Sequence, residues 1–116
     1  MGLDMYLVKR KDTEVAYWRK ANAIHNWMVQ NVQFGEDNCR DYWVSKEKLE
    51  QLLDVCNRVL ADNSLAPKLL PTQSGFFFGS TDYDEWYFEN VEYTKKMIED
   101  LIEKDDFEDL YYGSSW

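Results

Sequence analysis

The sequence predicts a single α+β domain over residues 1–116, with a small sheet packed against three helices. Three observations lead to this fold class. Residues 3–9 alternate in the period of a strand, while residues 46–61 and 81–103 repeat apolar side chains in the period of a helix. A length of 116 residues also suffices for one hydrophobic core and is too short for two independent domains.

The chain is expected to begin with a strand and to continue into the central helix of the fold. In the strand, Leu3, Met5 and Leu7 share one face. The helix is predicted over Glu14–Phe34, where side chains suited to a core recur at intervals of 4, 3, 4 and 4 residues, and Gly35 ends it. That stripe consists of Tyr17, Ala21, Ile24, Met28 and Val32.

A second strand and a second helix follow. Tyr42–Val44 is a short aromatic and β-branched run of the kind found in strands. Ser45 is a natural N-cap for an amphipathic helix at residues 46–61, whose apolar stripe includes Cys56. Residues 62–74 contain two prolines and are predicted to form a loop.

The last third of the chain predicts two strands around a long helix. The stretch from Gly75 to Gly79 encloses three phenylalanines, so we expect a strand inside the sheet. The helix is predicted from Thr81 to about Glu103, and Leu110–Tyr112 is predicted as the final strand. The helical side chains expected to face the core are Tyr87, Val91, Thr94, Ile98 and Leu101. The predicted order is therefore strand, helix, strand, helix, strand, helix, strand.

The negative charge is concentrated in one segment. Residues 82–109 contain 12 acidic and 3 basic side chains, a net charge of −9, whereas the remaining residues contain 10 of each sign. A field of this sign repels a phosphate backbone and attracts basic surfaces. The charge distribution therefore argues against direct nucleic-acid binding and favours a basic protein partner.

The N-terminus and the cysteines predict a cytosolic protein. The first ten residues, MGLDMYLVKR, hold only a short apolar patch interrupted by charge, which fits neither a secretory signal nor a membrane span. Without an export signal, Cys39 and Cys56 are interpreted as reduced thiols, and Cys56 as a core residue.

One border of the Glu14–Phe34 helix collects the side chains best suited to a small ligand. There Trp18, Asn22 and His25 would lie in a row near Arg19, which fits a small polar or anionic ligand such as a nucleotide signal. The alternative is a half-buried histidine bonded to a carbonyl group or to water. A functional histidine needs a second group, and the sequence does not identify one for His25.

The sequence contains no catalytic or metal-binding motif. Cys39 and Cys56 are 17 residues apart without a C-x-x-C pair, which disfavours zinc, and a nucleophile pair of Cys39 with His25 would need an orienting group. The glycine-flanked stretch before Thr81 has a shape that suits anions, but the first helical turn after it holds carboxylates that repel phosphate. We therefore expect neither enzyme activity nor a cofactor.

The acidic helix is the other candidate surface. Its outer face is either a solubilising surface or a docking surface for a basic groove, and its aromatic residues are of the types that anchor protein interfaces. The residues expected to contact a partner are Asp82, Tyr83, Asp84, Glu85, Trp86, Glu89, Glu92 and Tyr93.

Four stretches spread over nearly the whole chain are GLDMYL, YWRKANAIHNW, LPTQSGFFFGSTDYDEWYF and YYGSSW. Together they resemble a group of small, largely uncharacterised proteins from bacteriophages and prophages. The resemblance implies a setting in the infected bacterial cytoplasm, without implying a reaction or residue roles. In that setting we expect an inhibitor or regulator of a host protein with a basic surface, such as a defence component. The alternative is a small-ligand binding protein that sequesters a nucleotide signal.

Overall fold

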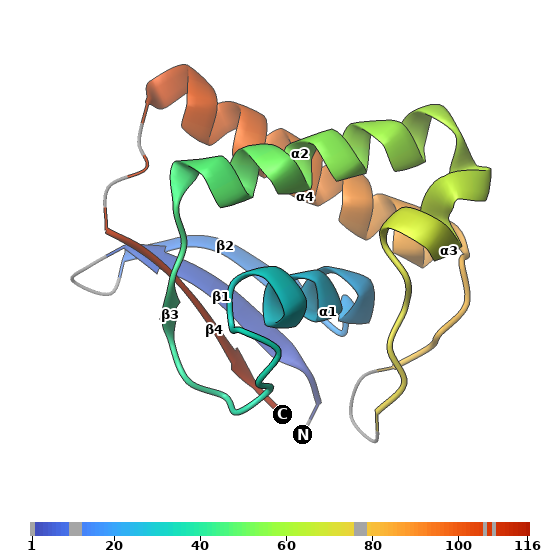
Figure 1. Ribbon diagram of the computed structural model, residues 1–116, viewed down its shortest axis with the longest axis horizontal. Coiled ribbons are helices and arrows are strands. Elements are labelled where there is room, and N and C mark those ends of the chain that lie inside the picture. Colours follow the sequence, from blue (N-terminus) through green and yellow to red (C-terminus); the bar gives the residue numbers. More distant parts are fainter. Residues whose placement is uncertain (1, 10–12, 76–78, 106, 108) are drawn as a thin grey trace.

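The computed structural model describes residues 2–9, 13–75, 79–105, 107 and 109–116. Within these residues the fold is α+β, as predicted, with helices gathered on one side of a four-stranded antiparallel sheet (Figure 1). The strands are β1 (Asp4–Lys9), β2 (Thr13–Arg19), β3 (Tyr42–Trp43) and β4 (Leu110–Ser115). The helices are α1 (Asn22–Asn31), α2 (Lys46–Ala61), α3 (Ala66–Leu69) and α4 (Glu85–Lys104), with a 3-10 helix, η1, at Asn63–Leu65.

The strands are arranged in the order β2-β1-β4-β3. The two central strands come from opposite ends of the chain, since Asp4 of β1 pairs with Ser115 of β4 and Lys9 pairs with Leu110. This pairing brings the two chain ends side by side (Figure 1). The predicted strands at residues 3–9, 42–44 and 110–112 are therefore confirmed, although the first begins at Asp4, the second ends at Trp43 and the last extends to Ser115.

The predicted helix over Glu14–Phe34 is wrong in its first part. Thr13–Arg19 forms strand β2, and α1 begins only at Asn22. Pairing with β1 outweighs the helical spacing, because it buries alternate side chains of β2, including that of Trp18. Tyr17, expected in the buried stripe, lies on the opposite face and is 41% exposed.

The boundaries of α1 depend on residues in the left-handed region. Lys20, with φ of 55°, turns the chain from β2 into the helix. The helix ends at Asn31, and the chain reverses at Phe34 (φ 56°) and Gly35 (φ 81°), so Gly35 lies beyond the last helical turn. The stripe residues that fall in or beside the helix, Ala21, Ile24, Met28 and Val32, are buried as predicted.

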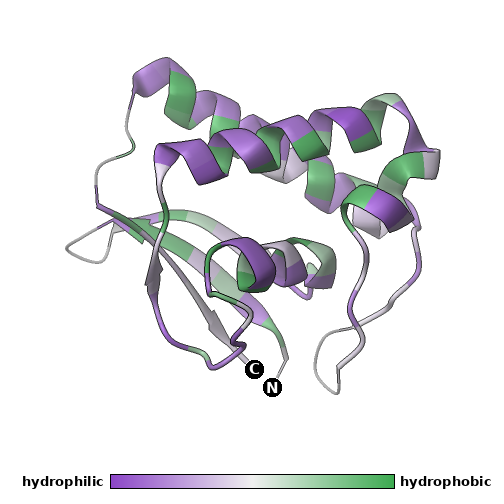
Figure 2. Ribbon diagram, viewed as in Figure 1, coloured by the Kyte–Doolittle hydropathy of each residue, from purple (hydrophilic) through white to green (hydrophobic). Residues whose placement is uncertain are grey.

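The helix α2 agrees with its prediction in both boundaries. The Ser45 hydroxyl caps it by accepting from the Lys48 backbone N–H at 3.2 Å, and Cys56 is fully buried. Both α2 and α4 alternate hydrophobic and hydrophilic residues in the manner of amphipathic helices (Figure 2). Their apolar sides pack on each other and over the sheet.

The helix α4 buries the five residues predicted to face the core. It begins at Glu85 and not at Thr81, because the Asp84 carboxylate is the group that accepts from the backbone N–H of Tyr87, at 3.0 Å. It ends at Lys104, where Asp105 adopts the left-handed conformation.

Two other expectations need correction. The predicted loop at 62–74 contains η1 and α3. Gly75 and Gly79, the flanks of the expected inner strand, are exposed and lie outside the sheet, while Phe76–Phe78 lie outside the described residues. Over the described residues, the elements follow one another in the order β1, β2, α1, β3, α2, η1, α3, α4 and β4.

Candidate functional site

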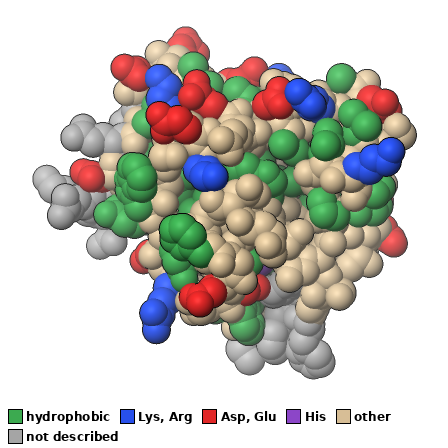
Figure 3. Space-filling view, in the orientation of Figure 1, with side chains coloured by type: hydrophobic (Ala, Val, Ile, Leu, Met, Phe, Trp, Pro, Cys, Tyr) green, Lys and Arg blue, Asp and Glu red, His purple; other side chains and the backbone are tan. Residues whose placement is uncertain are grey.

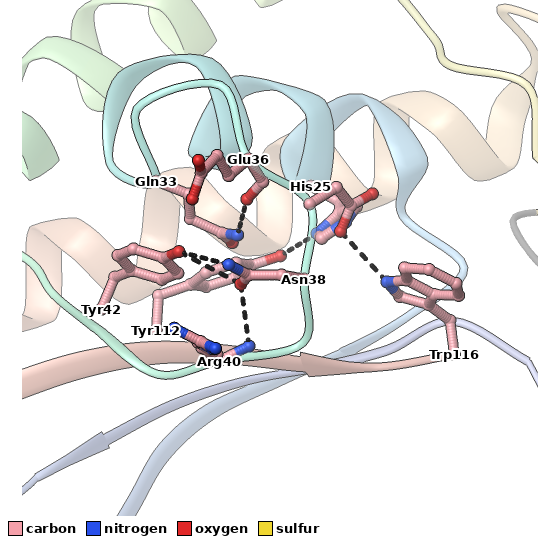
Figure 4. Close-up of polar contacts among 9 residues, drawn as sticks. His25, Gln33, Glu36, Asn38, Arg40, Tyr42, Tyr112 and Trp116 are labelled. Carbon is pink, nitrogen blue, oxygen red and sulfur yellow. Dashed lines mark hydrogen bonds and ion pairs between the residues drawn. The ribbon is translucent and has the colours of Figure 1, made fainter.

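His25 lies in a buried polar cluster that joins α1, β4 and the segment between α1 and β3. Its Nδ1 is 2.6 Å from the hydroxyl oxygen of Tyr112, and its Nε2 is 2.9 Å from Oδ1 of Asp37 (Figure 4). The indole N–H of Trp116 donates to the same Asp37 oxygen at 3.0 Å. His25 and Tyr112 have no exposed surface.

The hydrogen-bond partners define which nitrogen of the neutral ring carries the proton. A carboxylate can only accept, so Nε2 of His25 carries the proton that is donated to Asp37. Nδ1 of the neutral ring then accepts from the Tyr112 hydroxyl. Burial lowers the pKa of His25 and outweighs the opposing effect of Asp37, and burial also raises the pKa of Tyr112 well above 10. The His25 side chain in this cluster is therefore neutral.

The segment between α1 and β3 holds Asp37 in place through local hydrogen bonds. The Gln33 side-chain amide donates to the backbone carbonyl of Glu36 at 2.7 Å. The Asn38 side chain contacts the Tyr42 hydroxyl at 2.8 Å and accepts from the Arg40 backbone N–H at 3.2 Å (Figure 4). Asp37 thus reaches His25 from a constrained turn.

An aspartate, a histidine and a tyrosine in a row resemble the parts of an acid–base relay. General acid–base catalysis requires that a ring nitrogen or the terminal hydroxyl reach a substrate. Both nitrogens of His25 already bond to protein groups, and Tyr112 is fully enclosed. The geometry therefore favours a structural role, in which the cluster holds together α1, β4 and the segment between α1 and β3.

The residues predicted to accompany His25 are not brought together around an open site. Trp18 is buried in the core, where its indole N–H donates to the Thr94 hydroxyl at 2.8 Å. Arg19 is the next residue on the strand, so its side chain lies on the opposite face of the sheet, where it is exposed. Asn22 is buried, and its side chain donates to the Ser80 carbonyl and accepts from the Gln73 backbone N–H.

The cleft beside Asn22 is too small for a nucleotide. It lies between the start of α1 and α4, with Lys20, Thr72 and Trp86 among its lining residues. Its enclosed volume is about 20 Å³, enough for one water molecule. Pockets for drug-sized ligands hold about 300–1,000 Å³. The geometry at this border does not favour the small-ligand alternative.

All eight residues predicted to contact a partner are exposed. They lie on α4 and on the turn before it, and they are Asp82, Tyr83, Asp84, Glu85, Trp86, Glu89, Glu92 and Tyr93. On the described part of the chain, four of their carboxylates have no ion pair, namely those of Asp82, Asp84, Glu85 and Glu89. The carboxylate of Glu92 is 3.2 Å from the Lys96 amine.

The two halves of α4 therefore differ in charge. In the C-terminal half, Lys95 pairs with Glu99 at 3.2 Å and Lys104 pairs with Asp100 at 3.1 Å. Acidic and basic side chains are interspersed at the upper left of the molecule, where this end of α4 lies (Figure 3). The segment Asp82–Glu89 holds four carboxylates and no lysine or arginine. The uncompensated field is thus strongest at the start of the helix.

The three aromatic residues of this surface are not equivalent. Tyr83 accepts from the backbone N–H of Thr72 at 3.2 Å, and Tyr93 accepts from that of Tyr17 at 3.2 Å, so both hydroxyls support the fold. Trp86 is 52% exposed and, among the described residues, makes no hydrogen bond or ring contact. It is the aromatic side chain most available to a partner.

A shallow groove lies beside the acidic residues, between the end of α2 and the first half of α4. Its volume is about 420 Å³. Leu60 and Phe88, both half-buried, give it an apolar lining, and Glu85, Glu89 and Glu92 line it with carboxylates. A groove with this combination suits a segment that is apolar on one side and basic on the other.

Sequence reasoning missed Asp37 and Tyr112, the partners of His25. They lie 12 and 87 residues from it, and no local spacing links them. The closing YYGSSW, an aromatic stretch at the end of the predicted last strand, was the available hint that a tyrosine lies at the sheet centre. Cys56 is buried, with its pKa raised to about 12 by burial, while Cys39 is exposed.

Comparisons with known proteins give no further guidance on this site. No protein family, curated protein or solved structure matches the chain. Within the described ranges, no three His, Cys, Asp or Glu side chains converge as metal ligands would. In the same ranges, no helix combines the length and the apolar run needed to cross a membrane.

Proposed function

We propose that this is a phage-type binding protein that inhibits or regulates a host protein through the start of α4. The observation that carries the proposal is the juxtaposition of four carboxylates without ion pairs in the described structure, an exposed Trp86 and a shallow groove in which Leu60 and Phe88 lie among glutamates. The resemblance to phage proteins supports a host partner, such as a defence component.

The chemistry of this surface selects a basic partner. Asp82, Glu85 and Glu89 would steer a positively charged surface toward the helix, and association would slow as salt screens the attraction. Trp86 would then be buried, since tryptophan is among the residues that contribute most to interface affinity. A partner surface that normally holds nucleic acid has the required charge.

Association rates test the proposal. Biolayer interferometry would measure binding to a panel of purified bacterial DNA- and RNA-binding proteins with basic surfaces. The variant D82N/E85Q/E89Q should associate about tenfold more slowly at low salt with any panel member that binds. Asp84 is left unchanged because it caps α4.

The matched control is E99Q/D100N/E103Q, which removes the same number of charges from the other half of α4. It should change the association rate by about twofold or less, since those carboxylates include two paired with lysines. Equal slowing by both variants would reject the start of α4 as the docking surface. No binding to any panel member would reject this class of partner.

A second variant tests the aromatic anchor. Trp86→Ala should cost about 2 kcal/mol of binding free energy, mostly as a dissociation rate about 30-fold faster. Tyr83→Phe is its control, because Tyr83 keeps its ring and loses only a hydroxyl that contacts Thr72. An unchanged dissociation rate for Trp86→Ala would contradict the anchor role.

A further inference from the structure

The shallow groove between the end of α2 and the first half of α4 carries its charge along one wall. Glu85, Glu89 and Glu92 recur at intervals of 4 and 3 residues on α4, which places their side chains in one row. Leu60 of α2 and Phe88 of α4 pack partly against the core. Because these two side chains are half-buried and the glutamates are exposed, the groove is apolar at its base and acidic along one edge.

The row of glutamates is not neutralised by neighbouring side chains. Among the described residues, Glu85 and Glu89 have no ion pair, and Glu92 has one, with the Lys96 amine at 3.2 Å. Both side chains of that pair are more than half exposed, so solvent screens their attraction. An occupant that brings positive charge along the groove is therefore attracted at each of the three positions.

The walls of the groove determine which conformation a bound segment can adopt. Both long walls are α-helices, in which backbone N–H and C=O groups bond within the helix. Such walls offer no row of backbone donors and acceptors of the kind that an added strand requires. An extended segment would cover Leu60 and Phe88 with its own backbone groups unpaired, which costs free energy at each group. A helical segment satisfies those groups internally.

The length of the groove fits about two turns of such a helix. Glu85 and Glu92 are seven residues apart, which corresponds to about 10 Å along α4. Over about the same distance, a helix lying alongside presents apolar side chains at positions i, i+4 and i+7 to Leu60 and Phe88. Basic side chains on the flank of that helix then face the row of glutamates.

We propose that this groove binds an amphipathic, basic α-helix of the partner protein. The inference rests on the proposed function and names the part of the basic partner that enters the site. Lysine or arginine side chains of the helix pair with Glu85, Glu89 and Glu92, and its apolar side chains cover the base of the groove. Trp86 lines the cleft on the other flank of α4, so it remains available to a second part of the same partner.

Charge and depth disfavour other occupants of the groove. A nucleic acid, an anionic membrane surface and a second copy of this chain, of net charge −9, would each bring negative charge to the row of glutamates. A small molecule would remain largely exposed in so shallow a groove, whereas ligand pockets enclose most of their ligand. A basic helical segment of a protein fits both the charge and the shape.

Two synthetic peptides of equal composition test the proposal. Each consists of about 14 leucine and lysine residues, with the leucines in the helical period in one peptide and in the strand period in the other. Fluorescence anisotropy at low salt should show that the helical-period peptide binds the wild-type protein with a dissociation constant of about 10 µM. The strand-period peptide should bind at least about tenfold more weakly. Circular dichroism should show that the first peptide gains helix on binding.

Protein variants locate the bound peptide. Leu60→Lys places a cation at the base of the groove and should weaken binding of the helical-period peptide at least about tenfold. Leu53→Lys is the matched control, because Leu53 is also half-buried, lies two turns earlier on the same side of α2 and does not line the groove. It changes the net charge equally and should alter binding by about twofold or less. Asn63 is exposed and lines the groove, so Asn63→Lys keeps the fold and should also weaken binding.

The outcomes separate this inference from the proposed function. Equal binding of the two peptides would overturn the helical occupant, and equal weakening by Leu60→Lys and Leu53→Lys would overturn the groove as its site. If neither peptide binds while D82N/E85Q/E89Q still slows association with a panel protein, the inference is wrong and the docking surface stands. If the helical-period peptide binds the groove and no panel protein binds, the inference holds and the proposed class of partner is wrong.

Discussion

Burial disfavours the protonated form of the His25 ring in the folded protein. Because burial lowers its pKa in the folded state below 6.5, the unfolded chain takes up the proton first as pH falls. The contribution of His25 to stability is therefore complete above about pH 6.5 and declines as pH falls below that value.

Urea unfolding between about pH 8 and 5.5 measures this dependence. The wild-type free energy of unfolding should fall in the lower part of the range, while His25→Asn should be less stable at pH 8 and nearly independent of pH there. His25 is the one histidine of the chain, so no other imidazole can contribute. Equal slopes for the two proteins would contradict the neutral, buried state of His25.

Trp18 joins β2 to α4 through a single side-chain hydrogen bond. Trp18→Phe should leave the Thr94 hydroxyl without its donor and should destabilise the fold by about 2–3 kcal/mol through the lost bond and lost volume. With Thr94→Val added, a double-mutant cycle should give a coupling energy of about 1 kcal/mol. Strict additivity of the two substitutions would show that the bond adds nothing to stability.

At the level of residues, burial of the helical stripes could be predicted and polar partners could not. The five inward residues of α4 follow from spacing alone, because helix geometry places them on one side. The bonds from His25 to Asp37 and Tyr112 depend on how distant segments meet. Asp37 and Tyr112 have no sequence signal that distinguishes them from other polar residues nearby.

Among the elements, β2 shows the limit of periodicity. Thr13–Arg19 contains β-branched and aromatic residues and alternates buried Ala16 and Trp18 with exposed Tyr17 and Arg19, but its spacing also continues the stripe of α1. Local pattern fits both structures, and pairing with β1 decides between them. The turn at Lys20 was not visible either, because a lysine carries no preference for a positive φ.

The turn after α1 requires a residue that tolerates the left-handed region. Gly35 has φ of 81°, and a side chain at this position would meet open space. Gly35→Ala should therefore destabilise the fold by about 1 kcal/mol through backbone strain alone. Thermal unfolding measures the loss, and Gly79→Ala should cost more, since its Cβ would also approach the Lys20 side chain at 3.2 Å. An equally stable Gly35→Ala protein would contradict this turn.

One pair of like charges at the start of α4 opposes helix stability. Glu85 and Glu89 are one turn apart and repel each other, so Glu89→Lys should stabilise the helix by about 0.5 kcal/mol. The same substitution should slow association with a basic partner. Chemical unfolding and association rates measured on one variant would test both effects. A variant that loses stability and keeps its association rate would contradict both.

For the whole molecule, the fold class and the segregation of charge could be predicted from composition and period, whereas the strand order could not. The register alone shows that Tyr6, Gly113 and Trp43 lie on one surface, the face of the sheet turned away from the helices. Each of these residues is unremarkable in its own segment. Their common face depends on contacts between strands that are distant in sequence.

The net charge should make the stability of the whole molecule depend on salt. Repulsion within a chain of net charge −9 opposes the compact state, so raising salt from about 20 to 200 mM should raise the melting temperature. The variant D82N/E85Q/E89Q should show a smaller rise than the wild-type chain. Differential scanning fluorimetry measures both, and a melting temperature that falls with salt would contradict the expectation.

The pairing of β1 with β4 also determines when the protein can fold during synthesis. Nearly the whole chain must leave the ribosome before β4 is available, so the β1–β2 hairpin waits with one edge unpaired. Closing so long a loop late is expected to make folding slow. Because the paired ends lie side by side, joining them and opening the chain elsewhere would make this contact local and should speed folding.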